Sequence, residues 1–262
     1  MADLTDLTDN SAERLAADSL RQAAVIAALA ATLTVNTLAN TLPINGQTTA
    51  DVSARFPLKI TPPGYVFGIW GLIYSGVLGY AIYQALPAQR ANPRLRRIGW
   101  LFIVSCAANI AWILLWHYNR PRQTLGAMFG ILLALIAITT RLGKPLQGPL
   151  AERLLVRLPF SIYLGWISVA TLVNVTVALS DLGWDGLGIA PDLWTVGLLG
   201  TGTALGAGIG ALRGDPAFPL VLVWAFSGIA GKQADSPLVA NAAWLATAAS
   251  VLSALVGFWR GR

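Results

Sequence analysis

The sequence predicts an all-α integral membrane helical bundle, and three observations lead to that fold class. Of the 262 residues, 55% are hydrophobic and only 11% are charged, whereas soluble chains carry about 25% charged residues. The mean hydropathy is +0.62. The charges are clustered, so that eight stretches between the clusters contain no Asp, Glu, Lys or Arg. Such a chain would expose too much apolar surface in water, which excludes a cytosolic enzyme, a disordered tail and a secreted disulfide scaffold.

The uncharged stretches are interpreted as transmembrane helices, because a helix needs about 20 apolar residues to cross roughly 30 Å of hydrocarbon. Their length without strict alternation favours helices over barrel strands. The stretch 216–231 is short and contains Pro219, so we expect either a full crossing or a tilted, kinked or re-entrant segment. The other seven stretches are 22–43, 60–89, 98–119, 123–140, 158–180, 193–212 and 236–259.

Residues 1–21 are predicted to form an N-terminal cytoplasmic segment before an uncleaved first helix. A signal peptide begins with basic residues and has an apolar region of about 7–15 residues. This segment instead contains five acidic residues against Arg14 and Arg21, and a full span follows it.

The distribution of Lys and Arg predicts the orientation, because cytoplasmic loops are enriched in both residues. With eight crossings, the face that holds the N-terminus collects 13 of the 18 basic residues and the opposite face 5. With seven crossings the split is 12 to 6, so the count does not decide between the two topologies. Eight crossings place both termini in the cytoplasm, and the expected location is a bacterial inner (cell) membrane.

The feature that points to a function is a set of aromatic residues inside the spans. The chain has 10 tryptophans, and four of them fall near predicted span ends, where such rings anchor a helix. Inside three other spans, rings recur with small or amide residues at helical spacing and share one helix face. These sets are Trp70 with Tyr74; Asn109 with Trp112 and Trp116; and Trp166 with Ala170 and Asn174.

Two interpretations of these faces remain open. If they converge, they form a pocket with flat aromatic walls and few hydrogen-bonding groups, which suits a large planar apolar ligand. Alternatively, the rings fill helix interfaces and the amides connect neighbouring helices.

Two further patterns concern the architecture. The loop 44–59 is long and polar, so it is either a lid or a simple connector. Small residues at four-residue spacing allow helix backbones to approach closely, which predicts helix packing at two places. These are Gly202, Gly206 and Gly210 in one span and Gly126 and Gly130 in another.

No catalytic and no metal site is predicted. No span has an ionisable residue at its middle, which weakens the case for an ion-driven transporter. The single histidine, His117, lies near a span end without a carboxylate in its local sequence, and Cys106 is expected in the core.

The segments that carry these aromatic residues resemble the translocator protein family, also called tryptophan-rich sensory proteins (TspO/MBR). Residues 61–74 read TPPGYVFGIWGLIY, one residue shorter before the tryptophan than the common pattern of the second helix. Residues 107–120 (AANIAWILLWHYNR) and 163–174 (YLGWISVATLVN) match the third and fifth helices. The sterol-recognition pattern of animal members is missing after the fifth helix.

The resemblance covers 22–180, the size of a whole family member, and implies a five-helix membrane domain with an internal pocket for porphyrins. The long first loop would close the pocket. Residues 181–262 would add about three transmembrane helices, which makes this chain a longer relative. Carried over by position, the implied ligand-binding residues are Tyr65, Trp70, Tyr74, Asn109, Trp112, Trp116, Trp166, Ala170 and Asn174, and the lid or entry residues are Pro62 and Pro63.

The sequence therefore predicts a membrane receptor or sensor-type protein, and not an enzyme, that binds a planar hydrophobic ligand such as a tetrapyrrole. Porphyrin or haem is expected as a ligand and not as a resident cofactor. The expected partners are membrane lipid, the ligand and a second copy in a homodimer, with no nucleic acid. Two alternatives are a carrier for a small apolar solute and a membrane enzyme that degrades porphyrin.

Overall fold

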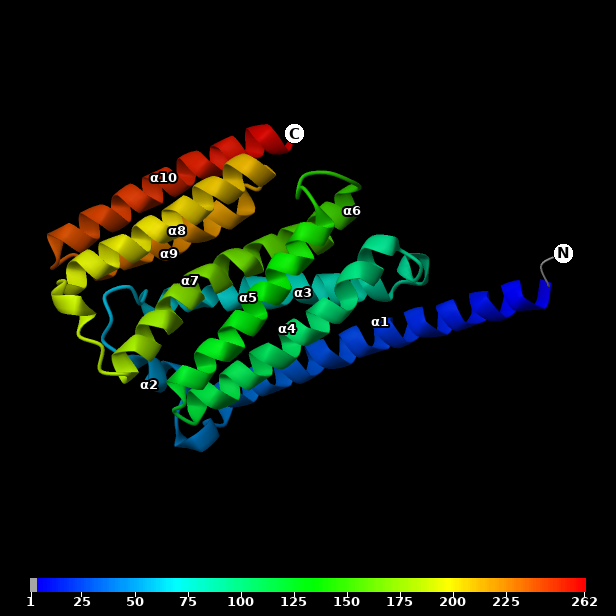
Figure 1. The fold of residues 1–262 in the computed structure, drawn as a ribbon, viewed down its shortest axis with the longest axis horizontal. Helices are drawn as coiled ribbons and strands as arrows, with labels where there is room; N and C mark the ends of the chain where they lie inside the picture. Colours follow the sequence, from blue (N-terminus) through cyan, green and yellow to red (C-terminus); the bar gives the residue numbers. More distant parts are fainter. Residues whose placement is uncertain (1–3) are drawn as a thin grey trace.

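A computed structural model describes residues 4–262, with side chains from residue 13 onward, and this part of the chain is helical without strands. These residues form eight long helices, whose arrangement is drawn in Figure 1. Seven helical segments are long and apolar enough to cross a membrane, which confirms the predicted all-α membrane bundle. The long helices are α1 (Leu4–Thr41), α3 (Ile69–Ala85), α4 (Pro93–His117), α5 (Pro121–Leu142), α7 (Leu158–Asp181), α8 (Pro191–Arg213), α9 (Ala217–Lys232) and α10 (Pro237–Gly261).

Short elements lie between the long helices and follow from local sequence. The helix α2 (Thr49–Ala54) lies in the long first loop, and the 3-10 helix η2 (Gly64–Gly68) leads into α3. The single turn α6 (Leu150–Glu152) is followed by the π-helical turn η4 (Arg153–Arg157). Pro159, two residues after η4, has no N–H to donate, so the regular helical hydrogen-bond pattern is interrupted at this place.

Prolines also mark where the long helices begin. The first residue of α4, α5, α8 and α10 is a proline, where the missing N–H would have no partner within the helix. Pro219 is the third residue of α9, so it leaves the helix continuous. The continuous helix contradicts a kink at Pro219, whereas the tilted and re-entrant alternatives for 216–231 stay predictions. The 16 residues of α9 cover about 24 Å, so its full crossing stays a prediction.

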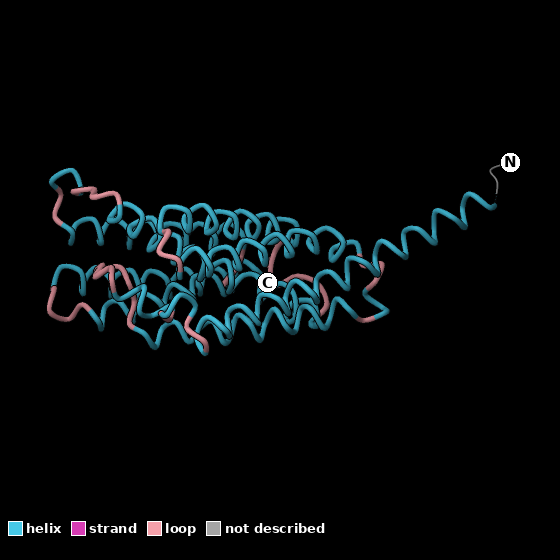
Figure 2. The backbone as a smooth tube through the Cα atoms, turned by 90° about the horizontal axis from the view of Figure 1, so that it is seen from below, coloured by secondary structure: helices cyan, strands magenta, loops and turns pink. Residues whose placement is uncertain are grey.

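The helices form two groups that lie side by side (Figures 1 and 2). The first group contains α1, α3, α4, α5 and α7, and the second contains α8, α9 and α10, with α9 packed on α7. Gly165 allows this approach, because a Cβ there would lie 3.0 Å from Val221 Cβ. The division into a domain 22–180 and added helices 181–262 stays a prediction.

Most of the predicted glycine packing is confirmed. A Cβ at Gly202 would lie 2.8 Å from Phe226 on α9, and one at Gly210 would lie 2.6 Å from the carbonyl oxygen of Ser253 on α10. A Cβ at Gly130 would lie 3.3 Å from the Cβ of Ala108 on α4. The packing role is wrong for Gly126, which has open space at this position.

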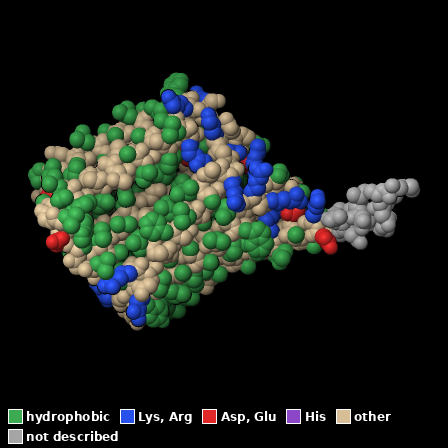
Figure 3. Space-filling model, in the orientation of Figure 1, with side chains coloured by type: hydrophobic (Ala, Val, Ile, Leu, Met, Phe, Trp, Pro, Cys, Tyr) green, Lys and Arg blue, Asp and Glu red, His purple; other side chains and the backbone are tan. Residues whose placement is uncertain are grey.

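Both ends of the described chain lie at the same end of the bundle (Figure 1), as an even number of crossings requires. Helix α1 begins at Leu4, so it includes most of the predicted N-terminal segment, of which residues 1–3 lie outside the described residues. Figure 3 shows Lys and Arg side chains over the end from which α1 projects, with few at the opposite end. The cytoplasmic assignment of the basic end stays a prediction.

Candidate functional site

A large cavity lies among α1, α3, α4, α7 and the long first loop. Its volume is about 1220 Å³, somewhat more than the roughly 300–1,000 Å³ of common small-molecule sites. Nine of the eleven residues implied by the resemblance line it. They are Pro62, Pro63, Trp70, Tyr74, Trp112, Trp116, Trp166, Ala170 and Asn174.

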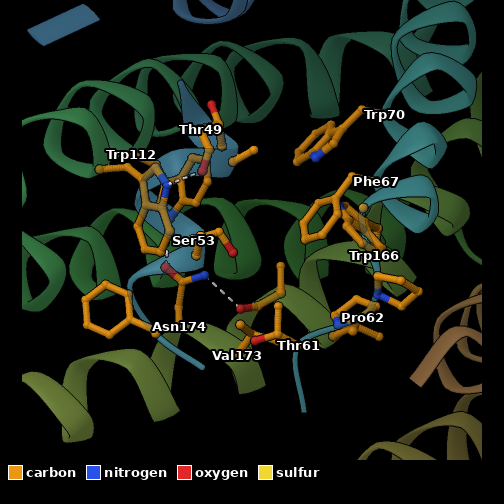
Figure 4. Close-up of a pocket in the computed structure, with 18 of the residues that line it drawn as sticks. Thr49, Ser53, Thr61, Pro62, Phe67, Trp70, Trp112, Trp166, Val173 and Asn174 are labelled. Atoms are coloured by element: carbon orange, nitrogen blue, oxygen red, sulfur yellow. Dashed lines mark hydrogen bonds between the residues drawn. The ribbon is translucent and has the colours of Figure 1, made fainter. Parts of the chain in front are cut away.

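One wall is built from rings of η2, α3 and α7 (Figure 4). The ring of Trp70 stacks on Tyr74 one helical turn later, with centroids 5.2 Å apart. Trp70 also meets Trp166 edge to face, at 6.3 Å. Phe67, which the sequence interpretation did not include, meets Trp166 edge to face at 5.6 Å. These contacts fix the rings, so the wall is formed before any ligand arrives.

The second aromatic wall belongs to α4. Trp112 and Trp116 stack with centroids 5.5 Å apart and planes tilted by 17°. The indole N–H of Trp112 donates to Asn174 Oδ1 at 2.9 Å, and that of Trp116 donates to the backbone oxygen of Thr49 at 3.2 Å. Asn174 in turn donates to the Ala170 oxygen at 2.8 Å. The amide of Asn174 therefore holds Trp112 in place.

Most of the chain matches a known protein family. The family model, described as TSPO-like protein, matches residues 22–256. The chain belongs to the TSPO-like protein family. The match runs past residue 180 and includes most of α10, so the family likeness is not limited to the first five spans. No curated protein and no solved structure matched the chain.

Two implied ligand-binding residues of this TSPO-like protein do not line the cavity. Tyr65 is 64% exposed and packs edge to face on Trp224 of α9 at 5.7 Å. Asn109 is buried behind the wall, where it accepts a hydrogen bond from Asn36 at 2.8 Å and donates to the Tyr163 hydroxyl at 3.4 Å. Asn36 itself lines the cavity, so Asn109 holds the side chain of a lining residue without lining the cavity itself.

The long first loop covers the cavity of this family member. Helix α2 begins with a capping box: the Thr48 hydroxyl accepts from the Asp51 N–H, and the Asp51 carboxylate accepts from the Thr48 N–H. The backbone and hydroxyl hydrogen bonds of Thr48 lower the pKa of the Asp51 carboxyl. Thr49 and Ser53, one helical turn apart, line the cavity. The loop thus covers one side of the cavity, and its role as a lid stays a prediction.

His117 fastens this loop to the end of α4. Its Nδ1 lies 3.2 Å from the carbonyl oxygen of Ile44, which can only accept, so Nδ1 carries the proton. Its Nε2 lies 3.0 Å from the Thr49 hydroxyl and accepts from it. Gln47 also donates to the backbone oxygen of His117, at a second point of the same loop. The single histidine thus has a structural role that the sequence interpretation missed.

The other side of the loop is fastened by the C-terminal helices. Lys232 donates to the Thr61 oxygen at 2.9 Å, and Gln233 donates to the Lys59 oxygen at 3.0 Å. Lys59, Lys232 and Gln233 all line the cavity. No local sequence signal marks these three residues, because contacts across more than 170 positions bring them together.

Proposed function

We propose that this TSPO-like multi-pass membrane protein is a receptor or sensor-type protein that binds a planar hydrophobic ligand, with a tetrapyrrole as the best candidate. The observation that supports the proposal is that Trp70, Trp112 and Trp166, from three different helices, line one cavity. Flat aromatic walls favour a flat guest through stacking and removal of apolar surface from water. Membrane lipid is the second partner, and a homodimer remains part of the proposal.

The indole N–H of Trp166 is enclosed within the aromatic wall. Its side chain is 2% exposed, and its indole N–H has no hydrogen-bond partner among the described residues. The N–H is shielded from the cavity, so Trp166 contributes its ring to the aromatic wall and no hydrogen bond to a ligand.

The lining residues favour binding of the tetrapyrrole ring over coordination of iron by histidine. Both ring nitrogens of His117 are engaged with Ile44 and Thr49, and His117 does not line the cavity. The lining residues include no Asp, Glu or His, the usual general acids and bases. We therefore propose a binding protein and assign it no catalytic step.

Replacing Trp166 tests the proposal directly. Trp166→Ala should weaken porphyrin binding by about 1–3 kcal/mol, the scale of a lost buried aromatic contact. Tryptophan-fluorescence quenching by porphyrin, titrated in detergent, measures the affinity. Trp100→Ala is the matched control, because Trp100 is 54% exposed and does not line the cavity. Equal affinities for the two variants and the wild type would contradict the proposal.

A further inference from the structure

The charged residues of the cavity differ from its apolar walls. Of all lining residues, only Lys59 and Lys232 carry a charge, and none is Asp or Glu. Both lysines are partly exposed to solvent beside a largely aromatic cavity, where a group of opposite charge would compensate their own charge. The two lysines differ in whether the protein itself supplies it.

Lys59 is compensated within the protein. Its ammonium forms an ion pair with Asp192 of α8. It also donates to the Ser236 hydroxyl at 3.2 Å, and Ser236 donates to the other oxygen of Asp192 at 2.8 Å. This closed set of three polar groups leaves Lys59 with a partner of opposite charge.

Lys232 has no such partner. It is absent from the ion pairs formed by the described side chains. Its hydrogen bond goes to an uncharged group, the backbone oxygen of Thr61, at 2.9 Å. Because an ammonium group has three donors, two remain for another acceptor. The exposed position of Lys232 places these donors at the mouth of the cavity.

The packing of α9 holds Lys232 at this place. Trp224, Gly228 and Lys232 follow each other at four-residue intervals and share one face of the helix. The Trp224 N–H donates to the Val66 oxygen at 2.9 Å, and a Cβ at Gly228 would collide with Val66. The glycine thus allows α9 to approach η2, and the next turn carries Lys232 to Thr61.

We propose that Lys232 is an anion-binding subsite at the mouth of the cavity, and that the ligand therefore combines a planar apolar body with a carboxylate. The aromatic body would lie between the tryptophan walls, and the carboxylate would accept hydrogen bonds from the Lys232 ammonium. The inference rests on the proposed function, because it assigns chemistry to the same ligand. It gives the C-terminal helices a direct part in recognition.

The test compares two probes that share one porphyrin ring and differ in their carboxyl groups: a porphyrin dicarboxylate and its uncharged dimethyl ester. Both are titrated by tryptophan quenching in an uncharged detergent, so that no lipid phosphate competes. The wild type should bind the acid about fivefold more tightly than the ester, the scale of one partly exposed ion pair. Lys232→Met should remove this preference, so that acid and ester bind equally, whereas Lys232→Arg should keep it. Lys144→Met, an exposed lysine outside the cavity, is the matched control.

The outcomes separate this inference from the proposed function. Equal binding of acid and ester by the wild type would overturn the anion subsite while leaving the ligand pocket intact, and this comparison needs no variant. If Lys232→Met weakens both probes equally, Lys232 only supports the loop, and the subsite is wrong. If the wild type binds neither probe, the proposed function fails together with the inference.

Discussion

Asp215 is a single residue that joins the two groups of helices. It lies in the turn between α8 and α9, is 4% exposed, and accepts the Ser161 hydroxyl of α7 at 2.7 and 2.6 Å. It also accepts the backbone N–H groups of Ala217 and Phe218 at the start of α9. Burial raises the pKa of the Asp215 carboxyl, although these hydrogen bonds oppose the shift.

The raised pKa predicts a pH-dependent stability. The folded protein holds the Asp215 proton more tightly than the unfolded chain does, so this group favours folding most at low pH. Its contribution falls as the pH rises from the ordinary aspartate value of about 3.9 through the raised pKa. The melting temperature of the wild type relative to Asp215→Asn should therefore fall over that range. Parallel melting curves for the two proteins would contradict this, and Asp235→Asn, at an exposed aspartate, is the control.

Residue spacing predicted which helix face a side chain occupies, but not which neighbour it meets. Trp112 and Asn109 share a face of α4, yet Trp112 reaches the cavity and Asn109 meets Asn36 behind the wall. Tyr65 matched a family position but packs on Trp224, a contact that depends on how α9 docks. The position of Lys232 at the cavity could not be predicted either, because it also depends on how α9 docks.

Among the helices, the packing of α8 depends most on glycine, because an added side chain at the contact would clash with the neighbouring helix. A Cβ at Gly210 would lie 2.6 Å from a backbone oxygen of α10, which cannot rotate away as a side chain could. Gly210→Ala should therefore force the helices apart and destabilise the protein by about 1–3 kcal/mol. Thermal unfolding in detergent measures the change.

Gly208 provides the control on the same helix. No atom lies within 4 Å of a Cβ built at this position. Gly208→Ala should be neutral or stabilise the helix by up to about 1 kcal/mol, because alanine has the higher helix propensity. Equal losses at Gly208 and Gly210 would show that the close contact is not the cause.

The long helices were predictable from composition, since each uncharged stretch must satisfy its backbone within the membrane. Their ends were less predictable. The stretch 60–89 was expected as one span, but α3 begins only at Ile69. The residues before it, Pro62 and Pro63, cannot donate backbone hydrogen bonds, and the neighbouring backbone oxygens of Thr61 and Val66 bond to α9 instead. Such a pairing is tertiary and has no local signal.

For the whole molecule, the arrangement of helices predicts which loops share a side of the membrane. The loop between α5 and α6 and the C-terminal end of α10 lie at the basic end, and the turn after α7 lies at the opposite end (Figure 1). Gln147 belongs to that loop and Leu182 to that turn. A membrane-impermeant thiol reagent applied to intact cells should label Leu182→Cys but neither Gln147→Cys nor Arg262→Cys. Buried Cys106 is first replaced by alanine to provide a cysteine-free background. Labelling of Arg262→Cys but not Gln147→Cys would indicate seven crossings.

The contact between α9 and the loop residues 59–66 has a consequence for any shortened version of this protein. A chain cut after Ser180 would retain every tryptophan of the pocket walls but would lose the hydrogen bonds from Trp224, Lys232 and Gln233. The cavity would then open sideways toward lipid acyl chains, which would compete with a ligand for the same apolar surface. A minimal biosensor based on this scaffold must therefore keep α9, even though the tryptophans that line the cavity all lie before it.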